Sequence, residues 1–458
     1  MKKSFVLLCF IFFSSFQLSL AQEQEFLIGG PMVGYVEHRS ALIWCEVSTE
    51  VKLATIRYWE YNNADYYYEL DYKGPLGNPY NPIKFELPKL KMDMRYFYEI
   101  ILNNKAVVSP YPLSFKTKKL WEYRTEAPDF TFLTGSCVYM NDHLYDRPQQ
   151  PPYGQDPVIL RTMGNTPADF MLWLGDNLYY READVSSVAG MYYRNSYNRS
   201  VAEMQPLLSA MPNYAIWDDH DYGPNNGHSS FELKDASLEI FKNYWGNKSY
   251  GEPDNPGTYG KFQWSDCEFF LTDGRYYRSP DNWNDSINGK PNCNKKFFGD
   301  KQMQWLKNNL LTSRATFKFI ACGSQVLNPM SRYDCIYNYP CEYNELMNFI
   351  AEYKINGIVF LSGDRHISEV IKVQPKKGYP LYDITSSPIT SGTFSKIKDL
   401  PEFNNPSRIP NTLIADNNFT RISISGKDKE RVLKMQFLNK ASEVLGDFSI
   451  NASELIFK

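Results

Sequence analysis

Four short apolar runs in this chain each end in a side chain that can bind a metal ion, and this repeated pattern constrains the fold more than any other feature. The run FMLWL, Phe170–Leu174, is followed by Gly175 and then by Asp176. Its length and composition are those of a buried strand. In open α/β sheets, ligands bind in the crevice outside the carboxyl ends of such strands. The pattern therefore favours an α/β domain that carries its chemistry at the ends of its strands.

The other three runs end in the same way. They are FTFLTGSC (130–137), PNYAIWDDHD (212–221) and GIVFLSGDRH (357–366). The chain has five histidines, and two of them, His220 and His366, stand at these ends. One such end alone is equally well explained by a turn in which a carboxylate binds its own backbone. Four of them in one chain favour a shared metal site.

The start of the chain has the pattern of a secretory signal peptide. Residues 1–21 carry Lys2 and Lys3, then an apolar segment at 5–13, and then Ser-Leu-Ala before Gln22. The apolar segment is shorter than the roughly 20 residues that a membrane-spanning helix needs, and no later segment reaches that length. We therefore expect cleavage near Ala21 and a periplasmic, cell-surface or secreted protein without a transmembrane segment.

Residues 26–118 predict a separate β-sandwich. They contain short alternating runs separated by turn residues, and no helical period is evident. Such runs predict half-buried strands, which fall at 41–47, 54–61, 83–87 and 95–102. We therefore expect an N-terminal domain of fibronectin or immunoglobulin type.

Residues 129–458 predict a layered α/β domain, joined to the sandwich by a polar linker at 120–129. Helical spacing of apolar residues alternates there with strand-like runs. The predicted helices fall at 156–163, 182–211, 231–245 and 298–312. Besides the four strand-end runs, strands are predicted at 261–273 and 317–326, with two or three more after residue 413.

The number of cysteines predicts that at least one thiol is not part of a disulfide. The chain has eight, of which Cys9 leaves with the signal peptide, and the remaining odd number cannot all be paired. Cys137, at a strand end, is our candidate for an unpaired thiol. Cys335 and Cys341 flank a short loop and can be bridged, whereas the pattern gives Cys293 no partner. Three others lie in apolar runs that favour buried thiols: Cys45, Cys267 and Cys322.

Charge and missing motifs argue against several functions. The formal net charge of −3 provides no basic field for nucleic acid. The sequence contains no G-x-S-x-G elbow, no G-x-x-x-x-G-K-[ST] loop and no H-E-x-x-H pair. These absences disfavour a serine hydrolase of the elbow type, a P-loop protein and a zinc protease.

Taken in order, the four strand-end motifs resemble those of the PhoD-like alkaline phosphatases, a branch of the metallophosphoesterase superfamily. The motifs are GSC (135–137), GDNLYY (175–180), WDDHD (217–221) and SGDRH (362–366). The resemblance extends to GPMVGYV (30–36), DGRYYR (273–278) and FGDKQMQWL (298–306). It implies a four-layer α/β/β/α metallophosphoesterase sandwich around a di- or trinuclear metal centre. The ions that it implies are Fe3+ with Ca2+, with Zn2+ or Mn2+ as alternatives.

The resemblance also implies a set of metal ligands. An acid shared by two cations, as Asp176 would be, holds them at the spacing that two-metal catalysis requires. Tyr179 would bind a ferric ion as phenolate, since only a strongly charged ion ionises a phenol at neutral pH. A thiolate at Cys137 prefers iron or zinc over calcium. The implied ligands are Cys137, Asp176, Tyr179, Asp219, Asp364 and His366.

The same motifs contain candidate catalytic residues. His220 lies between two aspartates whose charges would favour its imidazolium form, and we expect it to act as the general acid or as a donor to the leaving oxygen. Arg365 either holds a phosphate oxygen or orients Asp364. Asn177 either binds a metal or orients the attacking water.

Four further polar residues are candidates for supporting roles. Asp273 and Arg275 are expected to bind substrate or to support the residues that do. Gln325 and Asn328 fall near the place where relatives have another ligand, and the sequence leaves open whether either one is a ligand.

Together these features predict an exported, metal-dependent phosphoesterase of the PhoD-like type. We expect it to act through a metal-bound hydroxide on a small phosphate ester or a lipid, and to be a monomer. Two alternatives stay open. One is a phosphodiesterase or phospholipase on the same metal core. The other is a non-catalytic cell-surface binding protein in which the phosphoesterase domain serves as a scaffold.

Overall fold

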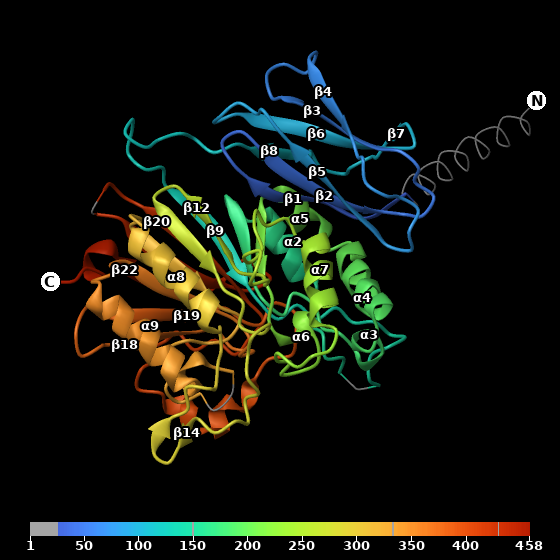
Figure 1. Cartoon of the computed structure of the whole chain (residues 1–458). Helices are drawn as coiled ribbons and strands as arrows, with labels where there is room; N and C mark the ends of the chain where they lie inside the picture. The colour runs from blue at the N-terminus through green and yellow to red at the C-terminus, as the bar shows by residue number, and fades with distance from the viewer. Residues whose placement is uncertain (1–25, 149–150, 332–333, 429) are drawn as a thin grey trace, which may run out of the picture. The chain divides into compact units, whose positions relative to one another are not determined.

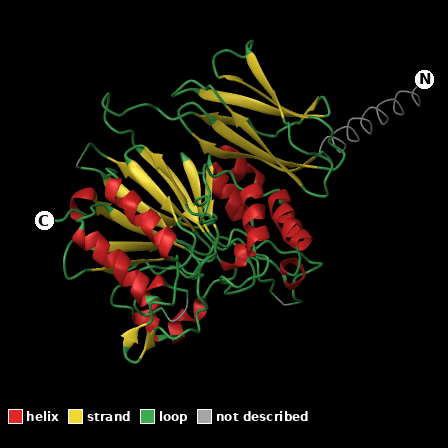
Figure 2. Cartoon of the chain, in the orientation of Figure 1, coloured by secondary structure: helices red, strands yellow, loops and turns green. Residues whose placement is uncertain are grey.

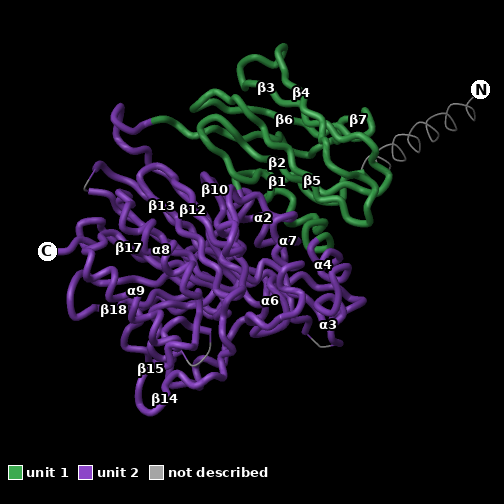
Figure 3. The backbone as a smooth tube through the Cα atoms, in the orientation of Figure 1, with its two compact units in different colours: residues 1–120, 196–212 green, residues 121–195, 213–458 purple. Residues whose placement is uncertain are grey.

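The chain forms two compact units, which are coloured separately in Figure 3. The computed structural model describes residues 26–148, 151–331, 334–428 and 430–458, so the predicted signal peptide at 1–21 lies outside the described residues. Unit 1 contains the described residues up to Leu120 together with Ser196–Pro212. Unit 2 contains Trp121–Asn195 and Asn213–Lys458. Residues 196–212, which the sequence pattern assigns to the second domain, thus group with unit 1.

Unit 1 has two antiparallel sheets that share one apolar core. Buried and more exposed residues alternate along strands such as β5 (Asn81–Leu87) and β6 (Arg95–Leu102), so each strand buries one face. Buried side chains of both sheets, among them Ile43, Ile56 and Phe85, form the core. One sheet has the order β1 (Leu27–Val36), β2 (Ala41–Val47), β5. The other sheet has the order β4 (Tyr67–Asp71), β3 (Ala54–Glu60), β6, β7 (Lys105–Ala106). Strand β8 (Ser114–Lys116) also pairs with β6. The assignment of unit 1 to the fibronectin or immunoglobulin type stays a prediction.

The predicted helix at 182–211 is wrong as a single element. The structure divides it into α3 (Glu182–Val185), α4 (Val188–Ser200) and α5 (Gln205–Ala210). Pro206 lies in the first turn of α5, where a residue without an N–H can begin a helix but would interrupt a longer one. In unit 1, α5 packs against β1, where the Gln205 side-chain oxygen accepts the Gly30 N–H at 2.8 Å.

In the described part of the chain, unit 2 is built on two six-stranded sheets. The first has the order β11 (Asn213–Ile216), β10 (Phe170–Leu174), β9 (Phe130–Gly135), β20 (Phe419–Ser425), β21 (Val432–Leu438), β22 (Val444–Asn451). The second has the order β12 (Gly260–Trp264), β13 (Cys267–Leu271), β16 (Phe317–Ala321), β17 (Ile358–Ser362), β19 (Leu381–Thr385), β18 (Glu369–Val373). Strands β9 to β11 are parallel to one another, as are β13, β16, β17 and β19, so their carboxyl ends share one edge of each sheet.

An aromatic core joins these two sheets. Phe132 of β9 meets Phe269 of β13 edge to face, with ring centroids 5.2 Å apart, and meets Phe319 of β16 at 5.5 Å. Phe170 of β10 meets Phe262 of β12 at 5.4 Å. Such pairs each add about 0.5–1.5 kcal/mol beyond the area that they bury. The sheets therefore pack face to face, and this packing brings their carboxyl ends together.

Helices lie on both sides of the paired sheets (Figures 1 and 2). On one side are α8 (Asp300–Thr312) and α9 (Pro340–Glu352), and on the other α2 (Val158–Asn165) and α7 (Lys234–Tyr244). Helix α8 buries Met303, Leu306 and Leu310, the spacing of one helix face. Unit 2 is thus a mixed α/β sandwich. Helix α9 is not predicted from the sequence, because the Tyr, Asn and Pro residues before it are typical of a loop.

A single predicted strand at 261–273 is instead the hairpin formed by β12 and β13. Ser265 has a left-handed backbone, with φ of 51°, and turns the chain between the two strands. Among the described residues, no helix combines the length and the apolar character that crossing a membrane requires.

The predicted bridge between Cys335 and Cys341 is wrong. The disulfide joins Cys341, in the first turn of α9, to Cys293, which follows the small hairpin of β14 (Ser286–Ile287) and β15 (Lys290–Pro291). Cys335 is a buried thiol that donates to the Asn328 carbonyl at 3.6 Å, ahead of the 3-10 turn η1 (Ile336–Asn338). The three cysteines predicted to be buried thiols are confirmed as such: Cys45, Cys267 and Cys322.

Candidate metal centre

The predicted metal ligands lie just beyond the carboxyl ends of strands from both sheets. Cys137 follows β9, Asp176 follows β10, and Asp364 follows β17. Asp219 begins the short helix α6 (Asp219–Tyr222), directly after β11. Parallel strands end at a common edge, and the packing of the two sheets brings the two edges together. The fold therefore accounts for the meeting of side chains that are far apart in the sequence.

Several of these residues have a left-handed backbone. The φ angles are 62° at Cys137, 50° at Asp176, 68° at Asp364 and 55° at His366. A non-glycine residue in this region costs on the order of 1–3 kcal/mol and persists only where its surroundings hold it. Such strain is typical of residues whose side chains must point in one particular direction.

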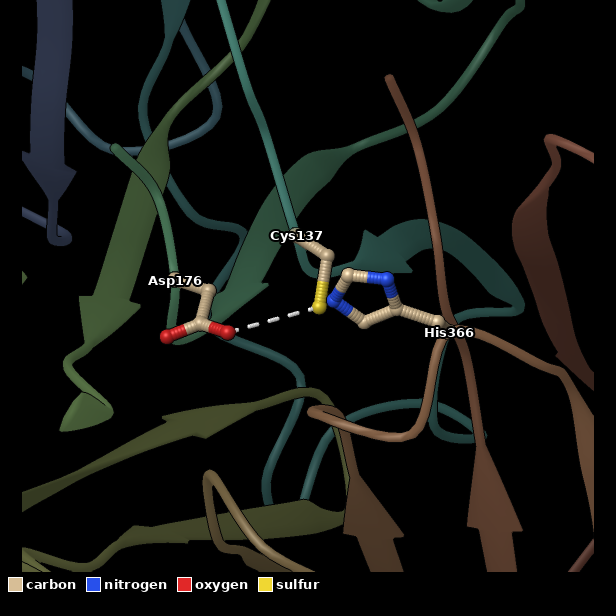
Figure 4. Close-up of side chains that lie close together, drawn as sticks. All are labelled: Cys137, Asp176 and His366. Carbon is tan, nitrogen blue, oxygen red and sulfur yellow. Dashed lines mark hydrogen bonds between the residues drawn. The ribbon is translucent and has the colours of Figure 1, made fainter. Parts of the chain in front are cut away.

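Four side chains converge on one position, which we call the thiol subsite: Cys137, Asp176, Tyr179 and His366. The Cys137 sulfur lies 3.5 Å from Asp176 Oδ2, and the Tyr179 hydroxyl lies 3.2 Å from the same oxygen. The Tyr179 hydroxyl is also 3.1 Å from His366 Nε2. Figure 4 shows the Asp176 carboxylate and the His366 ring directed toward the Cys137 sulfur from separate segments of the chain. The subsite thus offers sulfur, carboxylate, phenol and imidazole donors to one ion.

The hydrogen bonds of His366 favour the tautomer that a metal ligand needs. Its Nδ1 lies 2.6 Å from the Gly392 carbonyl, which can only accept, so Nδ1 carries the hydrogen. The lone pair of Nε2 is therefore directed toward Tyr179 and the interior of the subsite. Burial lowers the pKa of His366 to about 4, which keeps the ring neutral at physiological pH. A metal-binding histidine commonly donates its other ring N–H to a carbonyl in this way.

A second group of donors, which we call the carboxylate subsite, consists of Asp218, Asp219 and Asp364. One carboxylate oxygen of each lies within 4.8 Å of the others. Asp176 stands between the two subsites, because its Oδ2 faces Cys137 while its Oδ1 accepts the His220 N–H at 3.2 Å. Asp176 also forms a candidate ligand group with Asp219 and His220. This position fits the predicted role of a bridging carboxylate.

Unsatisfied oxygens indicate that the carboxylate subsite is suited to cations. Asp218 Oδ2, Asp219 Oδ1 and Asn177 Oδ1 are buried and have no hydrogen-bond partner among the described residues. A buried acceptor left in this state costs about 1–3 kcal/mol. Burial, and then the neighbouring carboxylates, raise the pKa values of Asp176 and Asp364 well above their usual range. Cations with a preference for oxygen would relieve both penalties, so the residues present fit a metal centre.

Asn177 presents its amide oxygen because its amide nitrogen is already engaged. Nδ2 donates to the Ile216 carbonyl at 2.7 Å and to Asp221 Oδ2 at 2.6 Å. Asp221 also accepts the backbone N–H groups of Asp176, Asn177 and Asp218 at 3.2, 3.1 and 2.6 Å. Asp221 is marked in the sequence only as a neighbour of His220, but in the structure this carboxylate ties the loop after β10 to the loop after β11.

The protonation predicted for His220 is wrong in direction. Its ring lies 4.1 Å from the Tyr179 ring between centroids, and its Nε2 is 4.0 Å from Asp219 Oδ2. Burial lowers the pKa of His220 and outweighs the opposing effect of Asp219. The ring is therefore neutral near pH 7 and can still donate a hydrogen bond.

The guanidinium of Arg365, a predicted catalytic residue, is engaged away from the subsites. Its Nη2 lies 3.0 and 2.8 Å from the two Glu402 carboxylate oxygens. Its Nη1 donates to Ser331 at 2.6 Å and to Gln325 Oε1 at 3.0 Å. Of the two roles that the sequence left open, these contacts favour orienting the 364–366 turn over holding a phosphate oxygen.

Gln325 and Asn328 belong to the same buried network as Arg365. Gln325 donates to Glu369 at 2.7 Å, and Asn328 donates to Glu402 at 2.7 Å.

The predicted substrate-binding residues Asp273 and Arg275 are fully buried in contacts within the protein. Asp273 Oδ1 accepts from Trp217 Nε1 at 2.8 Å and from the Arg275 backbone N–H at 2.9 Å. Arg275 Nε donates to Asp218 Oδ1 at 2.5 Å, and its Nη2 lies 3.2 Å from Asp334 Oδ1. Of the two roles that the sequence left open, these contacts favour support over substrate binding: Asp273 orders the loop that carries Arg275, and Arg275 is the counter-ion of the carboxylate subsite.

Two parts of the site are not predicted from the sequence. Asp218 is not among the predicted ligands, although it lies in WDDHD beside its predicted neighbour Asp219. The segment SSPITSG (386–392), directly after β19, contacts both Cys137 and His366. Its run of hydroxyl residues at a strand end was the available signal, but none of them is a strong metal ligand.

The fold and this donor set define the class of protein, a mixed α/β sandwich with a candidate metal centre at the carboxyl ends of its strands. A solved structure of PhoD superposes with a TM-score of 0.75 at 17% sequence identity, covering 95% of this chain and 92% of that chain. Purple acid phosphatase PPD1 from yellow lupin (Lupinus luteus) seeds superposes with a TM-score of 0.62 at 10% identity, covering 92% of this chain and 74% of that one. At these identities the likeness concerns the fold alone.

Sequence comparison identifies the family. The chain matches the PhoD-like phosphatase family over residues 151–429, which is more than half of its length. The chain belongs to the PhoD-like phosphatase family. Alkaline phosphatase D of Bacillus subtilis (strain 168) is 26% identical over 301 residues, 55% of this chain and 48% of that protein. The alignment thus spans about half of the relative's length.

Proposed function

We propose that this protein is an exported, metal-dependent phosphoesterase whose catalytic domain is the four-layer sandwich of residues 129–458. The observation that carries the proposal is the meeting of the thiol subsite and the carboxylate subsite at Asp176, with orphaned oxygens on the carboxylate side. Two adjacent cation sites that share one carboxylate suit the hydrolysis of phosphate esters. Membership of the PhoD-like phosphatase family supports the same function.

The two subsites would hold ions of different character. Cys137, Tyr179 and His366 suit a softer or more Lewis-acidic ion, with Fe3+ as our first choice and Zn2+ as the alternative. Asp219 and Asp364, with Asp218 and Asn177 beside them, suit a hard ion such as Ca2+ or Mn2+. When bound, such ions supply neutralising charge for phosphate oxygens and lower the pKa of water.

The chain's own residues would assist the leaving group, orient the attacking water and hold the loops that carry the ligands. The neutral His220 lies beside Asp219 and Tyr179 and would donate a hydrogen bond to the departing alcohol oxygen. The Asn177 side-chain oxygen, fixed by the two hydrogen bonds of its amide nitrogen, would accept a hydrogen bond from the attacking water or bind the hard ion. Arg275 would hold Asp218 in place, and Asp221 would hold the loops that carry Asp176 and Asp218.

Purified mature protein assayed on a mono-aryl phosphate tests this function. We expect hydrolysis that is lost on chelation of metal and in Asp176→Asn. Full activity in either case would refute the proposal. Parallel rates on a bis-aryl phosphate separate a phosphomonoesterase from a phosphodiesterase, because the same metal core serves both and the shape of the pocket decides. Elemental analysis without bound metal, together with no hydrolysis, would favour the alternative of a binding protein.

Export has separate support. Residues 1–21 have the pattern of a signal peptide, and the disulfide between Cys293 and Cys341 is of a kind that forms and persists in oxidising compartments. We propose that the mature chain begins near Gln22 and acts in the periplasm, at the cell surface or in the medium. N-terminal sequencing of protein recovered outside the cytoplasm tests this, and an intact Met1 in that fraction would contradict it.

A further inference from the structure

The segment SSPITSG, which follows β19, holds two residues of the thiol subsite. The backbone N–H groups of Thr390 and Ser391 donate to the Cys137 carbonyl at 3.2 and 3.1 Å. The Gly392 carbonyl accepts from His366 Nδ1 at 2.6 Å. One short segment therefore positions Cys137 and His366 relative to each other, although neither residue belongs to it.

Within this segment, Ser387 contacts both residues with a single hydroxyl group. Its oxygen accepts the His366 backbone N–H at 2.9 Å, and it lies 3.2 Å from the Cys137 sulfur. A hydroxyl has one hydrogen to donate, and the His366 N–H can only donate. The Ser387 hydrogen is therefore directed at the sulfur. The side chain is fully buried, so water does not compete for this hydrogen.

Ser136 offers a natural comparison because its hydroxyl is also near the sulfur. It lies 3.5 Å from Cys137 Sγ but only 2.9 Å from the Ser386 carbonyl. A carbonyl oxygen is the stronger acceptor, and sulfur is a weak one. The single hydrogen of Ser136 therefore goes to the Ser386 carbonyl, which leaves Ser387 as the hydroxyl that serves the sulfur.

We propose that Ser387 is a positioning residue that sets the donor strength and the direction of the Cys137 sulfur toward the ion of the thiol subsite. The inference rests on the proposed function, which requires an ion there. A hydrogen bond to a coordinating sulfur withdraws electron density from it and fixes its orientation, and such bonds tune metal sites. The same hydroxyl fixes the His366 backbone, so the removal of one oxygen atom loosens two donors together.

Titration of the metal-free full chain with Co2+, followed by absorption, tests this role without turnover. Sulfur-to-cobalt charge transfer gives a band that reports on the sulfur, and we expect this band to be absent in Cys137→Ser. In Ser387→Ala the sulfur lone pairs lose their hydrogen bond and rise in energy, so the band should move to longer wavelength. The Co2+ dissociation constant should rise about tenfold, the lower end of what loss of a ligand-supporting partner costs.

Two further variants provide the controls. Ser136→Ala removes a hydroxyl that does not serve the sulfur, so its band and its Co2+ affinity should match those of the unmodified chain. Ser387→Thr keeps the hydroxyl and should retain the band position. If Ser387→Ala does not fold, the position of the band in Ser387→Thr decides, and a shift to longer wavelength there would overturn the proposal.

The outcomes are separable from those of the proposed function. An unchanged band and affinity in Ser387→Ala would overturn the role of Ser387, whatever the rate of phosphate ester hydrolysis. A band that persists in Cys137→Ser would also overturn it, because the sulfur would then not be a ligand. Loss of hydrolysis in Asp176→Asn bears only on the phosphoesterase proposal.

Discussion

The thiol subsite and the carboxylate subsite lie at the ends of the same two sheets but differ in charge. In the metal-free protein the thiol subsite is largely neutral, because burial raises the pKa values of Cys137 and Tyr179 well above their usual range and lowers that of His366 to about 4. The carboxylate subsite keeps an ionised oxygen on Asp219 and has a built-in counter-ion in Arg275. Burial raises the pKa of Asp219, but His220 and Arg275 outweigh burial and hold it below its usual range.

This difference bears on how each subsite selects an ion. A thiol and a phenol must lose protons when a metal binds, so only an ion that binds strongly to the resulting anions can occupy their subsite. The carboxylate subsite already contains ionised oxygen, and Arg275 offsets part of its charge. The two subsites should therefore discriminate between soft and hard ions, although they share Asp176.

Removal of the shared carboxylate should have the largest effect. In Asp176→Asn both subsites lose a ligand, and the loss of several kcal/mol of transition-state stabilisation corresponds to a fall of about 10³-fold in kcat/KM on an aryl phosphate. The content of bound metal should fall with it. Asp254→Asn is the matched control, since Asp254 is an exposed partner of Lys301, and it should retain full activity. Activity within tenfold of the unmodified protein in Asp176→Asn would mean that the subsites do not work as a pair.

A reciprocal pair of variants sharpens the contrast between soft and hard ions. Cys137→Ser should weaken Co2+ or Zn2+ binding about 100-fold. A four-ligand zinc site has a binding free energy of about 10–16 kcal/mol, so each ligand contributes about 3 kcal/mol, and the loss of that amount corresponds to about two orders of magnitude in affinity. The same variant should leave Ca2+ binding unchanged. Asp219→Asn should do the reverse. Equilibrium dialysis with both ions checks this, and equal losses for both ions in both variants would show that the division into subsites is wrong.

The stability of the metal-free protein should fall as the pH rises. Burial raises the pKa of Asp218 to about 6, against the opposing charge of Arg275. A carboxyl group with a higher pKa in the folded state binds more protons when folded. For Asp218 its stabilising contribution to the free energy of unfolding is therefore present at low pH and is lost as the pH rises from about 4 to about 6. Asp176 and Asp364 shift in the same direction.

His366, whose pKa is lowered to about 4, acts in the opposite direction, but it is one group against three raised carboxyl groups. We therefore expect the free energy of unfolding to be at least about 1 kcal/mol lower at pH 8 than at pH 5. Chemical denaturation at both pH values in the presence of chelator measures this difference. Asp218→Asn should reduce the dependence, since Asp176 and Asp364 still contribute, and saturating Ca2+ should reverse it by favouring the ionised carboxylates. A metal-free protein that is more stable at pH 8 than at pH 5 would contradict the raised pKa values of these buried carboxyl groups.

Ordered motifs predicted much of this site because each lies at the end of a strand whose composition is unmistakable. The run Phe170–Leu174 is entirely buried and corresponds to β10, and the position of Asp176 follows from it. The family resemblance indicated that the four motifs belong to one shared metal centre. Parallel strands in facing sheets then bring together residues as distant as Cys137 and His366 without further information.

What the sequence left open or got wrong has a common physical origin. The choice between the two roles of Arg365, Arg275 and Asp273 depends on partners such as Glu402 and Asp334, which are not marked by any local pattern. The direction of the pKa shift of His220 depends on desolvation, which only the packed structure determines. The contacts of Ser387 depend on the path of a loop. The local sequence determines which side chains stand at the end of a strand. Tertiary packing determines which of those side chains already have hydrogen-bond or ion-pair partners within the protein.

The smallest effect concerns the backbone, which is left-handed at some donors of the site and ordinary at others. Three donors of the thiol subsite and Asp364 of the carboxylate subsite are left-handed, whereas Asp218 has an ordinary extended backbone with φ of −132°. At a left-handed position alanine costs about 1–2 kcal/mol, which exceeds the entropic cost of about 0.5–1 kcal/mol for glycine. Metal-free Cys137→Gly should therefore be more stable than Cys137→Ala, by about 0.5–1 kcal/mol in chemical denaturation.

The buried thiol Cys322 is not among the left-handed residues and provides the comparison for this measurement. There the order should reverse, with Cys322→Ala more stable than Cys322→Gly by about 0.5–1 kcal/mol, because glycine has only its entropic cost at an ordinary backbone angle. If alanine is the more stable choice at both positions, the φ angle at Cys137 carries no strain. The thiol subsite would then hold its donors through hydrogen bonds such as that from Ser387, and not through a backbone forced into one direction.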